Sequence, residues 1–143
     1  MGYKFLKDVS IADVAFEAES SNLNELFGYA ADALVNTMIK NTKKISKKIT
    51  REFKVEADGL ELLLIAFLNK LIFYKDVEQL IFSESIVQIM NENKKWTAFC
   101  FVKGEKLNSK KHEFIVDVKA ATMHMLKVEQ NDRGWFARVV LDI

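Results

Sequence analysis

The sequence predicts an α+β fold in which two helices pack on a mostly antiparallel sheet. Two segments place apolar residues at helical spacing, and residues typical of a helix start precede each of them. Most of the remaining chain alternates apolar and polar residues, as half-buried strands do. The 143 residues contain no internal repeat and no proline. We therefore expect one domain spanning residues 1–143.

The N-terminal segment predicts strand and then helix. Residues 3–19 have the apolar positions of one strand, or of two short ones. Asn22 and Glu25 have the spacing of a capping box, in which a side chain accepts from a backbone N–H of the first helical turn. The helix that follows should end near residues 40–41, where polar side chains take over.

A second strand and a second helix are expected next. Residues 49–57 alternate apolar and polar side chains over a strand-like length. Asp58 and Glu61 repeat the capping signal ahead of residues 60–74. Because that segment is apolar nearly all round, it should form the central buried helix.

The C-terminal half is expected to consist of strands. Residues 80–90 and 95–104 should form a hairpin about a turn at 91–93, and a polar loop follows at 106–112. A long strand is expected over residues 113–129, then a turn and a last strand that begins at Trp135. One face of that last strand should carry Trp135, Ala137, Val139 and Leu141, and the other Phe136, Arg138, Val140 and Asp142.

Charge and hydropathy exclude several classes of protein. The formal net charge is +1, whereas proteins that hold RNA mainly through its phosphates usually have a clear basic excess. Direct RNA binding is therefore expected to be weak or absent. The longest apolar stretch, residues 62–68, is much shorter than a membrane span, and the N-terminus has no apolar core of a signal peptide. These features predict a cytoplasmic protein without a membrane partner.

The familiar catalytic motifs are missing from the sequence, so no enzymatic activity is predicted. Cys100, the single cysteine, lies in an apolar strand-like run and is expected to be a buried structural thiol. Of the two histidines, His112 follows two lysines and should be exposed, and His124 should be half-buried.

Two aspartates in apolar surroundings are better candidates for a site. Asp13 lies within an apolar segment, and Asp142 follows three apolar residues of the last strand. A carboxylate in such a position is costly unless it is paired, hydrogen-bonded or bound to a metal ion. Taken singly, each aspartate is more typical of a strand-end cap or a solvent-facing residue. With the terminal carboxylate of Ile143 beside Asp142, the three groups would suit a hard cation that prefers oxygen ligands.

The motifs, in their order along the chain, resemble those of the archease family. An aspartate near the N-terminus, two helix motifs, a Lys-His loop, a strand containing Val-Lys-Ala and an Asp-Ile ending all have counterparts here. They are found at Ser10–Asp13, Leu23–Phe27, Asp58–Leu63, Phe67–Asn69, Lys111–His112, Val118–His124 and Asp142–Ile143.

The chain also departs from the family pattern. Ser10 and Ile11 occupy the neighbourhood of the family's N-terminal histidine, Phe67 replaces a tryptophan and Met123 replaces a tyrosine. An additional glycine follows Asp58. These differences affect the details of the expected site more than the resemblance.

The resemblance implies an accessory protein for an RtcB-type RNA ligase. Proteins of this kind promote guanylylation and turnover of a ligase that acts in tRNA splicing and RNA repair. It further implies that a divalent metal ion, in the first place calcium, is held by Asp13, Asp142 and the carboxylate of Ile143. The residues implied in contact with the ligase are Lys111, His112, Asp117 and Lys119.

Two other functions stay open on the residues alone. The first is a general chaperone or interaction module for tRNA-modifying enzymes, which would act through its surface without the aspartates. The second is a nucleic-acid binder that uses the basic residues between Lys40 and Arg51. The nearly neutral balance favours a solvated strand face and loop for that cluster over a binding site.

Overall fold

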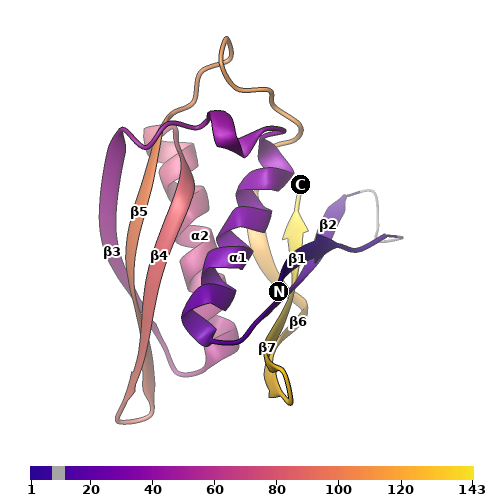
Figure 1. Ribbon diagram of the computed structural model, residues 1–143, viewed down its shortest axis with the longest axis vertical. Helices are drawn as coiled ribbons and strands as arrows, with labels where there is room; N and C mark the ends of the chain where they lie inside the picture. Colours follow the sequence, from indigo (N-terminus) through magenta and orange to yellow (C-terminus); the bar gives the residue numbers. More distant parts are fainter. Residues whose placement is uncertain (8–11) are drawn as a thin grey trace.

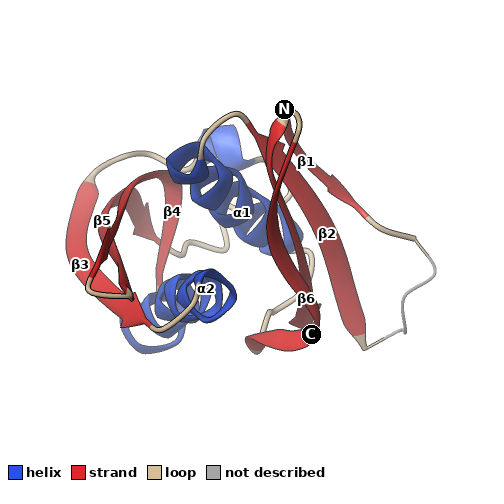
Figure 2. Ribbon diagram, turned by 90° about the horizontal axis from the view of Figure 1, so that it is seen from below, coloured by secondary structure: helices blue, strands red, loops and turns tan. Residues whose placement is uncertain are grey.

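The fold is known from a computed structural model, which describes residues 1–7 and 12–143. Two antiparallel sheets, with the strand orders β1-β2-β7-β6 and β3-β5-β4, stand on either side of two helices (Figures 1 and 2). The helices and strands are β1 (Gly2–Phe5), β2 (Asp13–Ser20), α1 (Leu23–Met38), β3 (Ile49–Ala57), α2 (Leu60–Glu78), β4 (Leu80–Glu92), β5 (Lys95–Lys106), β6 (Ala120–Asn131) and β7 (Gly134–Asp142). The α+β class is therefore confirmed, while the division into two sheets was not predicted.

The position of the helices between the sheets explains the apolar character of α2. This helix contacts β3 of one sheet and β6 of the other. Two of its faces are therefore buried, and both must carry apolar side chains. Phe67 and Leu68 are fully buried in the common core. The prediction of a buried helix holds for Leu63, Leu64, Leu71 and Ile72 as well, whereas Leu62 and Phe73 are exposed.

The two helix starts differ from each other. Oδ1 of Asn22 accepts from the N–H of Glu25 at 2.9 Å, as the first capping signal predicts. For α2 the N-cap is Gly59, and no side chain bonds to the first turn. The prediction of Asp58 as the cap is wrong because the inserted glycine moves its carboxyl one residue too far from the helix.

A strap joins the two sheets between β5 and β6. Residues 107–119 cross the end of α1, where Lys40 donates to the carbonyl of Glu113 and Ile115 donates to that of Met38. Only an isolated bridge between Ile39 and Phe114 resembles strand pairing there. The expected strand is therefore wrong for residues 113–119, because their partner is the end of a helix rather than a sheet edge.

The last strand is central to its sheet and binds both β2 and β6. Ala137, Val139 and Leu141 face the core, as the alternation predicts, and Val139 lies opposite Phe16 of β2. Arg138 and Asp142 therefore share the outer face, away from the helices. Within residues 1–7 and 12–143, neither helix has the combined length and apolar character that a membrane crossing requires.

Candidate functional site

Asp13 and Asp142 lie directly opposite each other, at the ends of β2 and β7. Both side chains are half-buried, and the pairing places them on the same face of the sheet. Cross-strand partners of this kind have Cβ atoms about 5 Å apart. The N–H of Ile143 donates to the carbonyl of Ala12 at 3.1 Å, which fixes the end of β7 against β2. The structure thus brings together the three residues that the sequence singled out for a cation.

The chemistry of this pair suits a hard cation. Like charges directly opposite each other on a sheet oppose its stability, and a cation between them would remove that repulsion. In the described part of the chain, no group of three His, Cys, Asp or Glu side chains is placed to hold a metal ion. An ion here would therefore depend on the two aspartates, on main-chain oxygens such as those of Ile143, and on water. Calcium accepts such mixed oxygen ligands.

The backbone of Lys119 is hydrogen-bonded to that of Asp142, one of the two aspartates. Its N–H donates to the carbonyl of Asp142 at 2.8 Å, and its side chain is exposed. Two residues earlier, the exposed Asp117 forms an ion pair with Lys75 of α2. The buried ammonium of Lys75 also donates to the carbonyl of Val118 at 2.8 Å. These contacts fix the end of the strap to α2 and place Lys119 beside Asp142.

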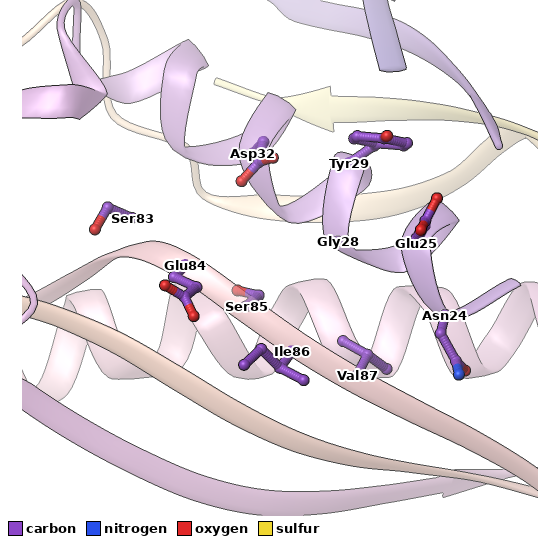
Figure 3. A pocket seen from close by; sticks show the side chains of 10 residues that line it. All are labelled: Asn24, Glu25, Gly28, Tyr29, Asp32, Ser83, Glu84, Ser85, Ile86 and Val87. Atoms are coloured by element: carbon purple, nitrogen blue, oxygen red, sulfur yellow. The ribbon is translucent and has the colours of Figure 1, made fainter. Parts of the chain in front are cut away.

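A groove of about 450 Å³ separates α1 from β4 (Figure 3). The carboxyl of Asp32 faces it, and although the residue as a whole is exposed, loss of water around the carboxyl raises its pKa to about 6. The Oγ of Ser83 is buried and has no hydrogen-bond partner within the described residues. This groove could not be predicted from the sequence. Asp32 occupies an ordinary polar position of the helix pattern, and only the fold brings Asp32 and Ser83 to the same groove.

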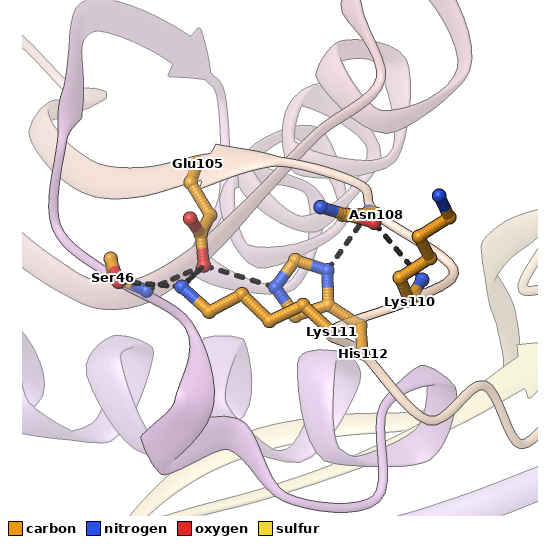
Figure 4. Close-up of polar contacts among 6 residues, drawn as sticks. All are labelled: Ser46, Glu105, Asn108, Lys110, Lys111 and His112. Atoms are coloured by element: carbon orange, nitrogen blue, oxygen red, sulfur yellow. Dashed lines mark hydrogen bonds and ion pairs between the residues drawn. The ribbon is translucent and has the colours of Figure 1, made fainter.

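A buried polar cluster surrounds Glu105, near the start of the strap (Figure 4). Its Oε2 accepts from the N–H of Ser46 at 2.8 Å, lies 2.7 Å from Nζ of Lys111 and lies 3.0 Å from Nε2 of His112. Since Nδ1 of His112 accepts from the N–H of Asn108, the ring donates to Glu105 through Nε2. Burial opposes the charged carboxylate, but the bonds from Lys111, Ser46 and His112 outweigh it and lower the pKa of Glu105 to about 2.

The expectations for the two histidines are wrong. His112 is buried, because its ring joins Glu105 of β5 to the backbone of Asn108 within the strap. His124 is exposed, because it lies in the irregular part of β6 between Thr122 and Lys127. Glu105 was not singled out from the sequence, where nothing distinguishes it from the other carboxylates of polar strand ends.

The buried thiol was predicted correctly. Cys100 points into the core from β5, and burial raises its pKa to about 12. A thiol with such a pKa is almost entirely protonated at neutral pH, so it is a poor nucleophile.

An apolar groove lies beneath the strap, beside the ion pair of Lys75 and Asp117. Its volume is about 390 Å³. The strap contributes three consecutive exposed apolar residues, of which Ile115 exposes 52% of its surface. Besides the two charged residues, the groove is lined by Met38, Ile39, Ile81, Leu107, Phe114, Ile115 and Val116. Adjacent exposed apolar residues of this kind are typical of contact surfaces.

Comparison with known proteins identifies the family. The model of the archease protein family matches residues 3–143. An archease of Pyrococcus abyssi is 38% identical over 133 residues, which cover 92% of this chain and 93% of the relative. One of Methanosarcina mazei is 32% identical over 142 residues, covering 99% and 95% of the two chains.

Two solved structures share the fold. The solution structure of Methanobacterium thermoautotrophicum protein 1598 is 31% identical and superposes with a TM-score of 0.86, covering 99% of both chains. A crystal structure of an archease from Thermotoga maritima, described as a possible chaperone, gives a TM-score of 0.60 at 21% identity and covers 96% of this chain and 97% of the other. Together with the match over residues 3–143, the relatives show that this chain belongs to the archease family.

Proposed function

We propose that this protein is a metal-binding accessory factor that activates an RtcB-type RNA ligase in tRNA splicing and RNA repair. It would promote guanylylation and turnover of the ligase without joining RNA ends itself. Membership of the archease family supports this function. The structural observation that carries it is the placement of Asp13 directly opposite Asp142 on one face of a sheet.

In this proposal Asp13, Asp142 and the main-chain oxygen of Ile143 hold a divalent ion, with calcium the first candidate. The bound ion would supply a fixed positive charge at this edge of the sheet. The half-buried positions of both aspartates favour an ion that keeps part of its water. Lys119 adds an exposed ammonium near the pair, since its backbone bonds to Asp142.

The remaining residues divide into contacting and positioning roles. Lys119, whose backbone bonds to Asp142, and Asp117, which pairs with Lys75, are both exposed and would contact the ligase directly. His112 is buried and would act by positioning, since it fixes the carboxylate of Glu105 to which Lys111 binds. Activation requires the protein to bind the competent conformation of the ligase more tightly than other conformations.

A chaperone function is the second candidate, and the apolar groove under the strap favours it. Phe114 and Ile115 expose about half of their surface beside this groove. Such a surface could cover apolar segments of tRNA-modifying enzymes and prevent their aggregation. The description of the Thermotoga maritima archease as a possible chaperone points in the same direction. This function needs neither Asp13 nor Asp142.

The test is guanylylation of a cognate ligase with GTP, with and without this protein. We expect the wild type to raise both the guanylylated fraction and the number of turnovers. Asp142→Asn should abolish most of this stimulation, because it removes one of the proposed ligands. Asp132→Asn is a matched control, since Asp132 is an exposed aspartate in the turn at the other end of β7. Full stimulation by Asp142→Asn would overturn the proposed role of the carboxylate pair.

Two further measurements test the metal site and the chaperone alternative separately. Calorimetric titration with calcium should show one site in the wild type and none in Asp142→Asn. Ile115→Ser tests the chaperone alternative: suppression of a client's aggregation should fall, while ligase stimulation is kept. Stimulation lost in Ile115→Ser and kept in Asp142→Asn would favour the apolar groove as the functional surface.

A further inference from the structure

The groove between α1 and β4 is lined by carboxylates, and none of the described residues that line it is basic (Figure 3). Glu25 and Asp32 belong to α1, and Glu84 belongs to β4. Glu84 has a counter-charge, since Nζ of Lys47 lies 2.8 Å from its carboxylate. Within residues 1–7 and 12–143, neither Glu25 nor Asp32 forms an ion pair. The groove therefore contains two carboxylates whose charge no described cation balances.

These two carboxylates are separated along the groove. Glu25 and Asp32 are seven residues apart, so they share one face of α1 and lie about 10 Å apart along its axis. Figure 3 shows Glu25 at one end of the groove and Asp32 toward the other. In the part of the chain that the structure describes, no three His, Cys, Asp or Glu side chains are placed to hold one metal ion. Two separated charges favour an elongated cation, charged at both ends, over a metal ion.

The middle of the groove is narrow and apolar. A Cβ added to Gly28 of α1 would meet the carbonyl oxygen of Ser85 at 3.5 Å, so the helix backbone lies against the edge of β4. Paired strands lie about 4.8 Å apart, so a peptide strand has no room to pair with β4 here. Tyr29, Ile86 and Val87 add apolar surface on the two sides. Such a space suits an alkyl chain.

A buried hydroxyl group lies at the end of the groove where Figure 3 also shows Asp32. The Oγ of Ser83 has no hydrogen-bond partner within the described residues. A buried polar atom without a partner opposes stability, and a ligand that donates a hydrogen bond would remove this cost. A primary ammonium group has three N–H donors, enough for a carboxylate, a hydroxyl and one water molecule.

Main-chain carbonyl groups of β4 provide further acceptors. The N–H of Ile89 donates to Oδ1 of Asn24 at 2.9 Å, so it points away from β5 and toward α1. Residues two apart on an antiparallel strand direct their backbone groups to the same side, so Ser85 and Val87 also direct their carbonyl groups toward α1. These acceptors suit an amine within the chain of a polyamine.

We infer that this groove binds an aliphatic diamine or polyamine. Asp32 and Ser83 hold one terminal ammonium group, Glu25 holds the other, and the alkyl chain crosses the apolar middle. The groove is formed by α1 and the sheet β3-β5-β4, whereas Asp13 and Asp142 belong to the other sheet. The inference therefore goes beyond the proposed function and does not depend on it.

The test is calorimetric titration of the wild type at low salt with diaminopropane, diaminohexane, diaminooctane and spermidine. Affinity should rise with chain length until the chain spans both carboxylates. Hexylamine is the matched monoamine, and it should bind about fivefold more weakly than diaminohexane because it forms one exposed ion pair fewer. An N-acetylated lysine amide, which represents a lysine side chain of a partner protein, should bind no better than hexylamine.

Variants identify the two carboxylates. Each of Asp32→Asn and Glu25→Gln should weaken the binding of diaminooctane about fivefold. Glu61→Gln is the matched control, because Glu61 lies in the first turn of α2 as Glu25 does in that of α1. Glu61→Gln and Asp142→Asn should both bind the diamine as the wild type does. Thermal melting confirms that each variant is folded.

The pH profile gives a second readout. Loss of water raises the pKa of Asp32 to about 6, while the ammonium groups of the ligand stay charged up to about pH 10. The titratable groups that also line the groove are Glu25, Tyr29 and Glu84, and a hydrogen bond from Lys47 lowers the pKa of Glu84. Affinity for diaminooctane should therefore rise between pH 5 and pH 8, and this rise should be absent in Asp32→Asn.

Three results would overturn the inference. One is the absence of saturable binding of diaminooctane and spermidine to the folded wild type. Another is equal affinity for hexylamine and diaminohexane, because recognition would then involve only one end of the ligand. The third is a loss of binding in Glu61→Gln as large as that in Glu25→Gln, because the amine would then respond to the overall charge of the protein.

Discussion

Nε2 of His112 lies 3.0 Å from Oε2 of Glu105, and the histidine side chain has no exposed surface. This contact belongs to a cluster that joins residues far apart in the sequence, since Ser46 donates its N–H to the same carboxylate oxygen. The cluster lies where β5 leads into the strap. The cluster therefore helps to hold Lys111 in place, since the ammonium of Lys111 is 2.7 Å from Glu105.

Glu105→Gln should destabilise the protein in a pH-dependent way. At neutral pH it removes charge-assisted bonds, with an expected loss of about 2 kcal/mol. The carboxylate has a pKa of about 2 in the folded protein and about 4.5 when unperturbed, so its contribution is complete above pH 4.5 and is lost as the pH falls toward 2. Melting temperatures of the two proteins should therefore converge in acid. A constant difference from pH 7 to pH 2 would contradict this.

Asp142→Asn should stabilise the metal-free protein. It removes one of two like charges placed directly opposite each other, an effect of about 0.5 kcal/mol. Thermal melting in a chelator should therefore show a small rise in Tm. On addition of calcium the order should reverse, because only the wild type gains binding free energy. Identical responses of the two proteins to calcium would contradict the role of the pair as ligands.

Asp32→Asn should raise the melting temperature at neutral and alkaline pH. Loss of water around this carboxyl raises its pKa to about 6 in the folded protein, from 3.8, so the folded state holds the proton more tightly. That contribution to stability is complete below pH 3.8 and is lost as the pH rises through 6. The advantage of the asparagine variant should therefore appear between these values and persist above them. A variant less stable than the wild type at pH 8 would indicate a stabilising partner for the carboxylate.

Lys75→Met should cost more stability than Asp117→Asn. The methionine keeps most of the buried stem but loses the bond to the carbonyl of Val118, for which we expect about 1–3 kcal/mol. Asp117 is exposed, so loss of its ion pair should cost less than about 1 kcal/mol. Denaturant unfolding measures both. Equal losses of unfolding free energy in the two variants would mean that the exposed ion pair, rather than the buried bond to Val118, holds the strap to α2.

Gly104→Ala should be strongly destabilising, by about 3 kcal/mol or more. A Cβ at this position would lie 1.7 Å from the carbonyl oxygen of Ile81, and backbone cannot move aside there without disturbing the sheet. Gly28→Ala is the comparison, because its Cβ would meet only an ordinary contact at 3.5 Å. Alanine in the interior of α1 should stabilise by up to about 1 kcal/mol. Melting temperatures that move in the same direction would contradict this account.

The sequence by itself determined the elements whose signals are local. The cap at Asn22, the alternation of β7 and the buried Cys100 each follow from residues close together in the chain, and each is confirmed. The family motifs span the chain for the same reason, because they can be read without knowing any contact. Local signals failed at Asp58, where one inserted glycine moved the cap, and at residues 113–119, where alternation was taken for a strand.

Only the tertiary structure decided which distant residues meet. Asp13 and Asp142 were each candidate ligands because of their apolar neighbours in the sequence. The antiparallel register of β2 and β7 is what places them opposite each other. The burial of His112 depends on Glu105 of β5, whose carboxylate also accepts from the N–H of Ser46 in the segment before β3. The exposure of Phe99 could not be predicted, since alternation defines two faces of a strand and packing alone decides which of them the helices cover.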